Sequence, residues 1–399
     1  MIGFSLHRQD ETRRSIMEDH RGNRMVRNRG EVEERTLHMR RKHWTTIMAG
    51  LVLAGLAAGP ASAEFKLKDP PKVAYILFAQ KNDGGWTQAH DEARMRIEAA
   101  MGVKIPFVEN VAENASEIRP AAEKFIQRGY NVIIGTAFGY SDTFKELSES
   151  YPDVAFLNAA GITNGPNLES YYGRTYESQY LCGMVAGAMS KSGKLGFVAA
   201  NPFGLVIWTI NAYALGAQKM NPNATVTAIF TGAWNDPVKE RAAAEALVEQ
   251  GIDVIGQHVD TPATQIVAQE KGIYGTGHHR DMREFAPKAT ICSSVWVWDR
   301  FLVPEIKKIA DGVWAPNPYG AFVAVKDGGT DIACCNAVVP KDVVAKVMAE
   351  RDALIAGKQV YAGPLADRDG KERVPAGQVL GDADLWKMDW FVKGVITQQ

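Results

Sequence analysis

The sequence predicts an α/β fold of two similar lobes, each a doubly wound, mainly parallel sheet with flanking helices. Short, continuously apolar segments, typical of strands buried on both faces, alternate with amphipathic segments of helical period. Polar loops that contain glycine follow many of these apolar segments. The alternation starts a second time near residue 194, so the 399-residue chain carries two α/β units in series.

The first lobe begins with the apolar segment 73–78, which we expect to be a central strand. A polar turn at 80–85 separates it from an amphipathic helix at 86–101. Strands and helices then alternate, which predicts parallel strands joined by helical crossovers. The further elements of this lobe are a helix at 118–128, a strand at 131–135, a helix at 142–149 and a strand at 154–158.

The second lobe repeats this pattern, and the elements after Asp281 must be shared between the two lobes. We assign 64–175, about 297–318 and 385–399 to the N-terminal lobe, and about 176–296 and 319–384 to the C-terminal lobe. The predicted strands are 194–199, 225–230, 253–257, 273–275, 289–296 and 321–325, and the predicted helices are 210–220, 237–250, 263–270, 300–310 and 340–356.

The N-terminal region has the pattern of a cleavable secretory signal peptide at 39–63. A charged start precedes an apolar stretch at 44–58 and a small-residue cleavage site that ends at Ala63. The apolar stretch is shorter than the roughly 20 residues that a membrane-spanning helix needs. No cysteine follows it, so we expect a periplasmic protein without a lipid anchor. We interpret residues 1–38 as a mis-assigned extension.

The composition excludes several classes of protein. Hydrophobic residues make up 46% of the chain and charged residues 23%, which is typical of a folded soluble protein. Lys and Arg number 45 and Asp and Glu 46, so no basic excess exists to bind nucleic acid. The four cysteines show no metal-ligand spacing, and their pairing stays open. The sequence lacks phosphate-loop, GxSxG and HExxH motifs, so we expect no metal, no cofactor and no enzyme activity.

The loops after the predicted strands carry the candidate binding groups. Ligands of open parallel sheets bind at the carboxyl ends of the strands. Here those loops combine aromatic side chains with amides and carboxylates, which suits a planar heteroaromatic ligand. The loops lie at 82–86, 136–140, 201–204, 234–236, 257–260 and 277–281.

These loops and their spacing resemble the basic membrane protein (BMP) family of substrate-binding proteins of ABC transporters, over nearly the whole chain after residue 63. The matching segments are 82–88 (Asn-Asp-Gly-Gly-Trp-Thr-Gln), 136–139 (Thr-Ala-Phe-Gly), 174–183 and 234–240. The resemblance implies a two-lobed periplasmic binding protein fold of type I, which closes by a hinge on its ligand. It also implies a purine ligand and a membrane permease as partners. We expect the protein itself to be a monomer.

Two departures from this family bear on the ligand. Relatives that bind nucleosides hold the ribose hydroxyls with an Asp in a Gly-Val-Asp-Arg-Asp loop and with a Lys that follows. Here His279 stands near the position of that Asp, and the segment 294–298 contains no Lys. The resemblance therefore implies a purine base, with adenine favoured, and a purine nucleoside as the alternative.

We predict the ligand site from side chains of these loops, several of which have a second interpretation. Trp86 and Phe203 either stack on the ligand or belong to the core. Asp83 is a ligand contact, a helix N-cap or both. Gln257 and Asp260 end a buried strand, where they bind ligand or form hydrogen bonds between the lobes. The predicted ligand-binding residues are Asn82, Asp83, Trp86, Phe138, Gly139, Phe203, Trp234, Gln257, Asp260, His279, Asp281 and Trp298.

Other interpretations stay open for the loops and for the whole protein. Trp234 either contacts the ligand or packs on the surface of a lobe. The neighbouring His278 and His279 do not easily bind one metal, so we expect them to form hydrogen bonds to ligand or backbone. The alternative functions are a ligand sensor, a sugar-binding protein and a nucleosidase-like enzyme.

Overall fold

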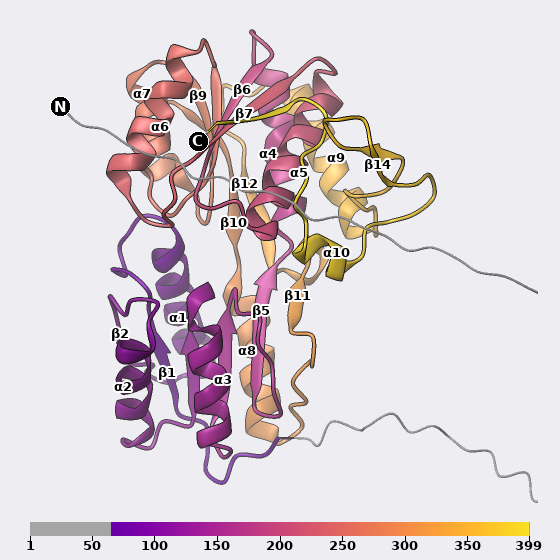
Figure 1. Cartoon of the computed structure of the whole chain (residues 1–399). Coiled ribbons are helices and arrows are strands. Elements are labelled where there is room, and N and C mark those ends of the chain that lie inside the picture. The colour runs from indigo at the N-terminus through magenta and orange to yellow at the C-terminus, as the bar shows by residue number, and fades with distance from the viewer. Residues whose placement is uncertain (1–64, 399) are drawn as a thin grey trace, which may run out of the picture. The chain divides into compact units, whose positions relative to one another are not determined.

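The computed structural model describes residues 65–398, and the predicted signal peptide and N-terminal extension lie outside the described residues. The described chain forms two large sheets with helices packed against their faces, one sheet in each lobe (Figure 1). All strands of the first sheet are parallel. In spatial order these strands are β11 (Ala321–Val323), β5 (Leu168–Gly173), β4 (Ala155–Ala159), β3 (Val132–Gly135), β1 (Val73–Ile76) and β2 (Phe107–Val108).

Successive residues of the strands in this sheet point to opposite faces, which are covered by different helices. Val73 and Tyr75 of β1 belong to the core cluster that contains residues of α1 (Trp86–Met101) and α8 (Trp298–Asp311). Ala74 and Ile76 belong to a separate cluster. Because both faces are buried, the strand is apolar along its whole length, as predicted. The helices that cover the second face are α2 (Ala115–Ile126) and α3 (Ser141–Ser150).

The second sheet has seven strands, and only the β10–β12 pair is antiparallel. In spatial order its strands are β12 (Thr330–Cys334), β10 (Thr290–Trp296), β9 (Tyr274–Gly277), β8 (Val254–His258), β6 (Lys194–Ala199), β7 (Thr225–Phe230) and β15 (Val395–Gln398). Its helices are α4 (Thr175–Met189), α5 (Gly204–Met220), α6 (Pro237–Glu249), α7 (Ala263–Glu270) and α9 (Lys341–Ile355). Helices α6 and α7 pack on one face, and α4 and α5 pack on the other.

Helix α4 was not predicted, because all but its last two residues are buried and no polar face marks a helical period. It lies so close to α5 that three positions, Gly183, Gly187 and Gly216, accept only glycine. A Cβ atom on Gly183 would lie 2.1 Å from the carbonyl oxygen of Tyr213, and one on Gly216 would lie 1.9 Å from that of Tyr180. The backbones of the two helices therefore touch.

The structure corrects the predicted lobe division at two edge strands. Strand β11 pairs with β5 in the first sheet, although we assigned 319–384 to the C-terminal lobe. Strand β15 pairs with β7 in the second sheet, although we assigned 385–399 to the N-terminal lobe. Each is a short strand at a sheet edge, and a short apolar pattern does not specify which of two sheets it extends.

The four cysteines differ in their bonding. Cys334 and Cys335 are joined by a disulfide bond, whereas Cys182 and Cys292 are free, with their Sγ atoms 3.4 Å apart. Within residues 65–398 no helix is both long and apolar enough to span a bilayer.

The remaining elements are short. They are η1 (Phe138–Tyr140), η2 (Met282–Glu284), η3 (Val325–Asp327), β13 (Leu365–Ala366), β14 (Glu372–Val374) and α10 (Asp382–Trp386).

Candidate functional site

A cavity lies between the carboxyl ends of strands from both sheets. The cavity has a volume of about 40 Å³, well below the roughly 300 to 1,000 Å³ of typical small-molecule sites. Most of the lining side chains are aromatic or aliphatic, and none is a Lys or an Arg. The lining residues are Phe78, Trp86, Glu113, Ala137, Phe138, Ala160, Tyr172, Leu205, Trp234, His258, Asp260 and His279.

Five predicted site residues meet at this cavity: Trp86, Phe138, Trp234, Asp260 and His279. They follow β1, β3, β7, β8 and β9, so the rule that ligands bind at the carboxyl ends of parallel strands brings them together. In the sequence these residues belong to separate loops, and the arrangement of the two sheets brings the loops together at the cavity.

Trp86 is the first residue of α1, and only 7% of its surface is exposed. Its indole Nε1–H donates a hydrogen bond of 2.7 Å to the carbonyl oxygen of Thr136. The edge of the ring meets the His279 imidazole at a centroid distance of 5.5 Å and an interplanar angle of 72°. Because the only polar atom of its side chain already has a hydrogen-bond partner in the N-terminal lobe, Trp86 presents an apolar aromatic surface to the cavity.

Asp260 and His279 form the polar centre of the cavity. His279 Nε2 lies 3.2 Å from Asp260 Oδ1 but makes no hydrogen bond of good geometry, so this nitrogen is unsatisfied in a buried position. Burial raises the pKa of Asp260 well above its usual value, and the nearby carboxyl groups of Asp83, Glu240 and Glu113 add to this shift. Burial also lowers the pKa of His279 well below its usual value. The His279 ring is therefore neutral at neutral pH, and the charged form of Asp260 is disfavoured by its burial.

Seven lining residues were not predicted from the sequence, namely Phe78, Glu113, Ala137, Ala160, Tyr172, Leu205 and His258. Tyr172 lies within β5, whose sequence Leu-Glu-Ser-Tyr-Tyr-Gly has no apolar run. His258 is the last residue of β8, next to the predicted Gln257, and burial lowers its pKa to about 3. Glu113 follows the two-residue strand β2 and accepts a hydrogen bond of 2.7 Å from the Gly139 N–H. Leu205 is the second residue of α5, whose start we predicted six residues too late.

Phe203 and Gly139 lie at the margin of the cavity. The Phe203 ring stacks on Phe138 at 5.6 Å and 16°, and it lies 5.9 Å from the Trp234 ring. With 43% of its surface exposed, Phe203 faces an adjoining groove that it shares with Phe138. Gly139 contributes its backbone N–H to Glu113, and a Cβ atom there would lie 2.7 Å from that side chain.

The structure places Gln257 and Trp298 away from the cavity lining. Gln257 Nε2 donates to the carbonyl oxygens of Val259 and Thr261, and its Oε1 accepts from Gln265 Nε2 at 2.9 Å. All these partners belong to its own lobe, so the predicted bond between lobes is not formed. Trp298 is fully buried and stacks on Trp296 at 4.3 Å, behind the residues that line the cavity.

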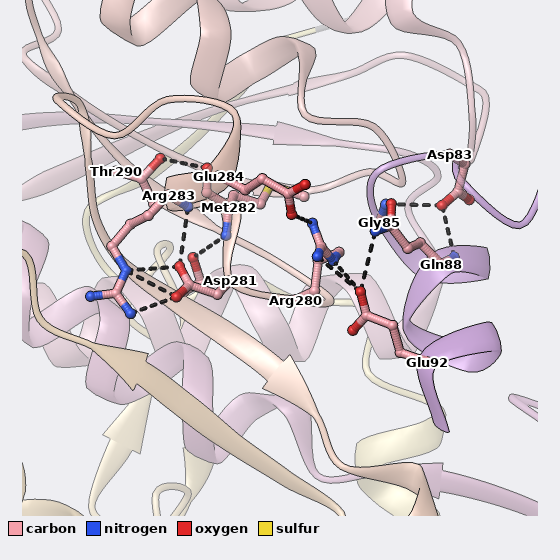
Figure 2. A network of polar contacts seen from close by, with 11 residues as sticks. Asp83, Gly85, Gln88, Glu92, Arg280, Asp281, Met282, Arg283, Glu284 and Thr290 are labelled. Carbon is pink, nitrogen blue, oxygen red and sulfur yellow. Dashed lines mark hydrogen bonds and ion pairs between the residues drawn. The ribbon is translucent and has the colours of Figure 1, made fainter. Parts of the chain in front are cut away.

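Asn82 and Asp281 also lie outside the cavity lining. Asn82 is exposed in the turn before α1. Asp281 accepts a hydrogen bond from the backbone N–H of Arg283 and pairs with the guanidinium of the same residue (Figure 2). It stabilises the start of η2, because polar side chains at such positions commonly bond to the local backbone.

Asp83 contacts the start of α1 instead of the cavity (Figure 2). Its carboxylate accepts hydrogen bonds of 2.9 to 3.0 Å from the backbone N–H groups of Gly85, Thr87 and Gln88. These are groups at a helix N-terminus that have no partner within the helix. The geometry therefore favours the capping interpretation of Asp83.

Asp83→Ala is expected to lower the free energy of unfolding by about 0.5 to 2 kcal/mol, the usual effect of losing an N-terminal cap. The midpoint of thermal unfolding without ligand measures this loss. Asp83→Asn, which keeps an acceptor oxygen, serves as the control and should lose less. A variant of unchanged stability with strongly reduced ligand affinity would contradict the capping role.

The two lobes touch at several places beside the cavity, two of which involve the backbone of Gly85 and the side chain of Arg280. Gly85 lies so close to the loop after β8 that a Cβ atom on it would be 1.7 Å from the Asp260 carbonyl oxygen. Arg280 reaches Glu92 on α1, with its Nη2 and Nε atoms 2.8 and 3.1 Å from Oε1, and it also pairs with Glu284 (Figure 2). In this structure the two lobes are therefore in contact with each other.

Glu92→Gln is expected to weaken ligand binding by roughly two- to tenfold, because a charged hydrogen bond that forms only between closed lobes is lost. Titration calorimetry measures the change. Asp342→Asn is a matched control, since Asp342 pairs with Lys346 within a single exposed helix. If both variants bind with wild-type affinity, the Arg280–Glu92 contact does not contribute to closure.

No group of three or more His, Cys, Asp or Glu residues within the described part of the chain is arranged to hold a metal ion. The cavity offers aromatic surface, the imidazoles of His258 and His279 and the carboxyl groups of Asp260 and Glu113. A cavity of this kind, enclosed between two α/β lobes in contact, defines a binding protein for a small solute.

The chain belongs to the Bmp family, described as ABC transporter substrate-binding protein PnrA-like, which matches residues 71–358. This confirms the resemblance seen in the loops. A purine-binding protein of Brucella abortus is 35% identical over 352 residues, which cover 87% of this chain and 97% of the relative. A putative ABC transporter glucose-binding protein of Haloferax volcanii is 35% identical over 247 residues, which cover 62% of this chain and 63% of the relative.

Solved structures confirm the predicted two-lobed periplasmic binding fold. A transcriptional activator of the comK gene from Bacillus halodurans superposes with a TM-score of 0.64 at 22% identity, covering 72% of this chain and 98% of that one. A solute-binding protein of an ABC transporter system from Conexibacter woesei superposes with a TM-score of 0.59 at 22% identity, covering 72% and 97%. At these identities the likeness concerns the fold alone.

Proposed function

We propose that this protein is the periplasmic binding component of an ABC importer and captures a free purine base, with adenine favoured. The observation that carries the proposal is the unsatisfied Nε2 atom of His279 beside the Asp260 carboxyl group, within a largely aromatic cavity. The purine-binding relative from Brucella abortus supports the ligand class. Closure of the two lobes around the base then presents the loaded form to a membrane permease.

The charge state of the cavity favours an uncharged ligand. Burial raises the pKa of Asp260 and lowers the pKa of His279, which disfavours the charged form of each, and no lysine or arginine lines the cavity. The phosphates of a nucleotide would lose their hydration there without gaining a cationic partner. A neutral planar base instead gains stacking on Trp86 and hydrogen bonds at its edge.

The position of His279 favours a base over its nucleoside. By the resemblance, this residue occupies the place where nucleoside-binding relatives hold the ribose. A free purine base has an N9–H donor beside the N3 acceptor, and these two groups match an Asp260 oxygen and a His279 N–H. A nucleoside carries its sugar on N9 and has no such donor. The pair therefore fits the edge of a free base that carries N3 and N9–H.

A second candidate ligand is a sugar, which the glucose-binding relative favours. Aromatic surfaces also bind the apolar faces of sugars, and an aspartate commonly accepts hydrogen bonds from sugar hydroxyls. The cavity differs from such a site in that most of its lining side chains are aromatic or aliphatic. This difference supports the purine base as the first candidate.

The proposal is tested by titration calorimetry of the purified protein, unfolded and refolded to remove carried ligand. Adenine, guanine, adenosine, ribose and glucose are titrated separately. We expect the tightest binding for adenine, weaker binding for adenosine and no heat from the sugars. Preference for adenosine would establish the nucleoside alternative, and a response to glucose alone would contradict a purine function. Free base released from adenosine during the titration would instead indicate a nucleosidase.

A further inference from the structure

Trp296 does not line the cavity, but two hydrogen bonds join it to His279. Its indole Nε1–H donates to His279 Nδ1 at 2.9 Å. Its backbone N–H donates to the His279 carbonyl oxygen at 3.0 Å. Trp296 ends β10 and His279 follows the neighbouring β9, so both bonds connect adjacent strand ends at the cavity.

We propose that Trp296 is a positioning residue that fixes the tautomer of His279, so that the imidazole presents an Nε2–H donor to the ligand. An indole N–H can only donate a hydrogen bond, so His279 Nδ1 must accept it and carries no proton. In a neutral imidazole the proton then resides on Nε2. This assignment of the His279 tautomer does not depend on which ligand binds. Only its consequence for ligand recognition rests on the proposed function.

The surroundings keep the His279 ring neutral and its position fixed. Burial lowers the pKa of His279, and the neighbouring imidazoles of His258 and His90 lower it further, which outweighs the opposite effect of the Val259 backbone carbonyl. The backbone at His279 has a φ of 74°, in the left-handed region that residues with a side chain seldom adopt. Such a conformation persists where surrounding bonds hold it, and here Trp296 bonds both the ring and the carbonyl group.

Trp296 is itself held by aromatic neighbours, so its indole cannot turn away. It stacks on Trp298 at 4.3 Å and 19°, and its centroid lies 5.1 Å from that of Tyr172. Only 5% of its surface is exposed. The donor therefore stays aimed at His279 Nδ1.

The tautomer decides which ligands the cavity can recognise. With the proton on Nε2, His279 offers a donor 3.2 Å from Asp260 Oδ1, which can act as an acceptor. This pair suits a ligand edge with an acceptor next to a donor, as in the N3 and N9–H groups of a free purine base. With the proton on Nδ1, the cavity would offer an acceptor instead, and the N3 atom would face a lone pair.

Trp296→Phe tests the inference, because it keeps an aromatic ring in the stack but removes the donor. The tautomer of His279 is measured by two-bond ¹H–¹⁵N correlation spectra of the ligand-free protein with ¹⁵N-labelled histidine. The His279 signals are assigned as those missing from His279→Gln. We expect an Nε2–H ring in the wild-type protein and a mixture of the two neutral tautomers in Trp296→Phe. Adenine affinity should fall by roughly three- to tenfold, as expected for one lost hydrogen bond.

Trp298→Phe is the matched control. Trp298 belongs to the same buried stack, but its Nε1–H has no hydrogen-bond partner within the described residues. This variant removes the same volume and should leave the His279 tautomer unchanged.

The outcomes separate this inference from the proposed function. A wild-type His279 with its proton on Nδ1, or an unchanged tautomer in a folded Trp296→Phe variant, would overturn the role of Trp296 whatever the ligand is. The wild-type spectrum decides the matter even if Trp296→Phe fails to fold. A tautomer that shifts as expected in a protein that binds no purine would support the role of Trp296 and contradict the proposed function.

Discussion

Trp86→Ala is expected to weaken adenine binding by about 1 to 3 kcal/mol, or roughly 5- to 150-fold in Kd, the usual range for losing a stacking contact between a base and an aromatic ring. Trp86 lines the cavity with an indole whose N–H is already bonded to Thr136, so its contribution to the ligand is aromatic surface. Titration calorimetry of the refolded variant gives the change in Kd.

The same substitution also removes a buried ring from contact with His90, Trp296 and Trp298. Truncation of such a ring to alanine costs about 3 to 5 kcal/mol of stability, so the melting curve must show that the variant is folded. Trp86→Phe is the control, since it keeps a stacking surface and should retain most of the affinity. A folded Trp86→Ala protein with wild-type affinity would assign Trp86 to the core alone.

His279→Asp is expected to shift selectivity from base to nucleoside. The substitution removes the donor next to Asp260 and places a second carboxyl group beside the first in a buried site. Adenine then loses one hydrogen bond and leaves a buried acceptor unpaired, which costs about 1 to 3 kcal/mol, or roughly 5- to 150-fold in Kd. Ribose hydroxyls can donate to the new carboxyl group, so adenosine should lose less affinity than adenine or gain some.

The measurement is the ratio of the Kd values of adenine and adenosine in the wild-type protein and in the variant. His279→Asn controls for the change in size, because it keeps an N–H donor at the position. If His279→Asp lowers both affinities equally, His279 does not discriminate between base and nucleoside.

Most of the fold followed from the alternation of apolar strands and amphipathic helices. The predicted bounds of β6, β7 and α7 match those of the structure, because each has a strong local pattern between clear turns. The sequence could not reveal α4, which is buried on all sides and has no amphipathic period. It also could not place β11 and β15, because their sheet depends on contacts far away in the chain.

The candidate site was predicted only in part, because the role of a polar residue also depends on the folded structure around it. The strand-end rule located Asp260 and His279, and it also selected Gln257, which the structure shows bonded within its own lobe. A polar residue at a strand end can bind a ligand or satisfy the local backbone, and only the fold distinguishes the two roles. Tyr172 was missed because β5 lacks an apolar run, although its side chain lines the cavity.

The most direct test of the account compares adenine with 9-methyladenine by titration calorimetry of the wild-type protein. The two ligands share the ring system for stacking, but the methyl group replaces the N9–H that we assign to the pair of Asp260 and His279. We predict that 9-methyladenine binds at least tenfold more weakly, as expected when a buried polar pair loses its partner. Equal affinity for the two ligands would contradict recognition of the free base through this edge.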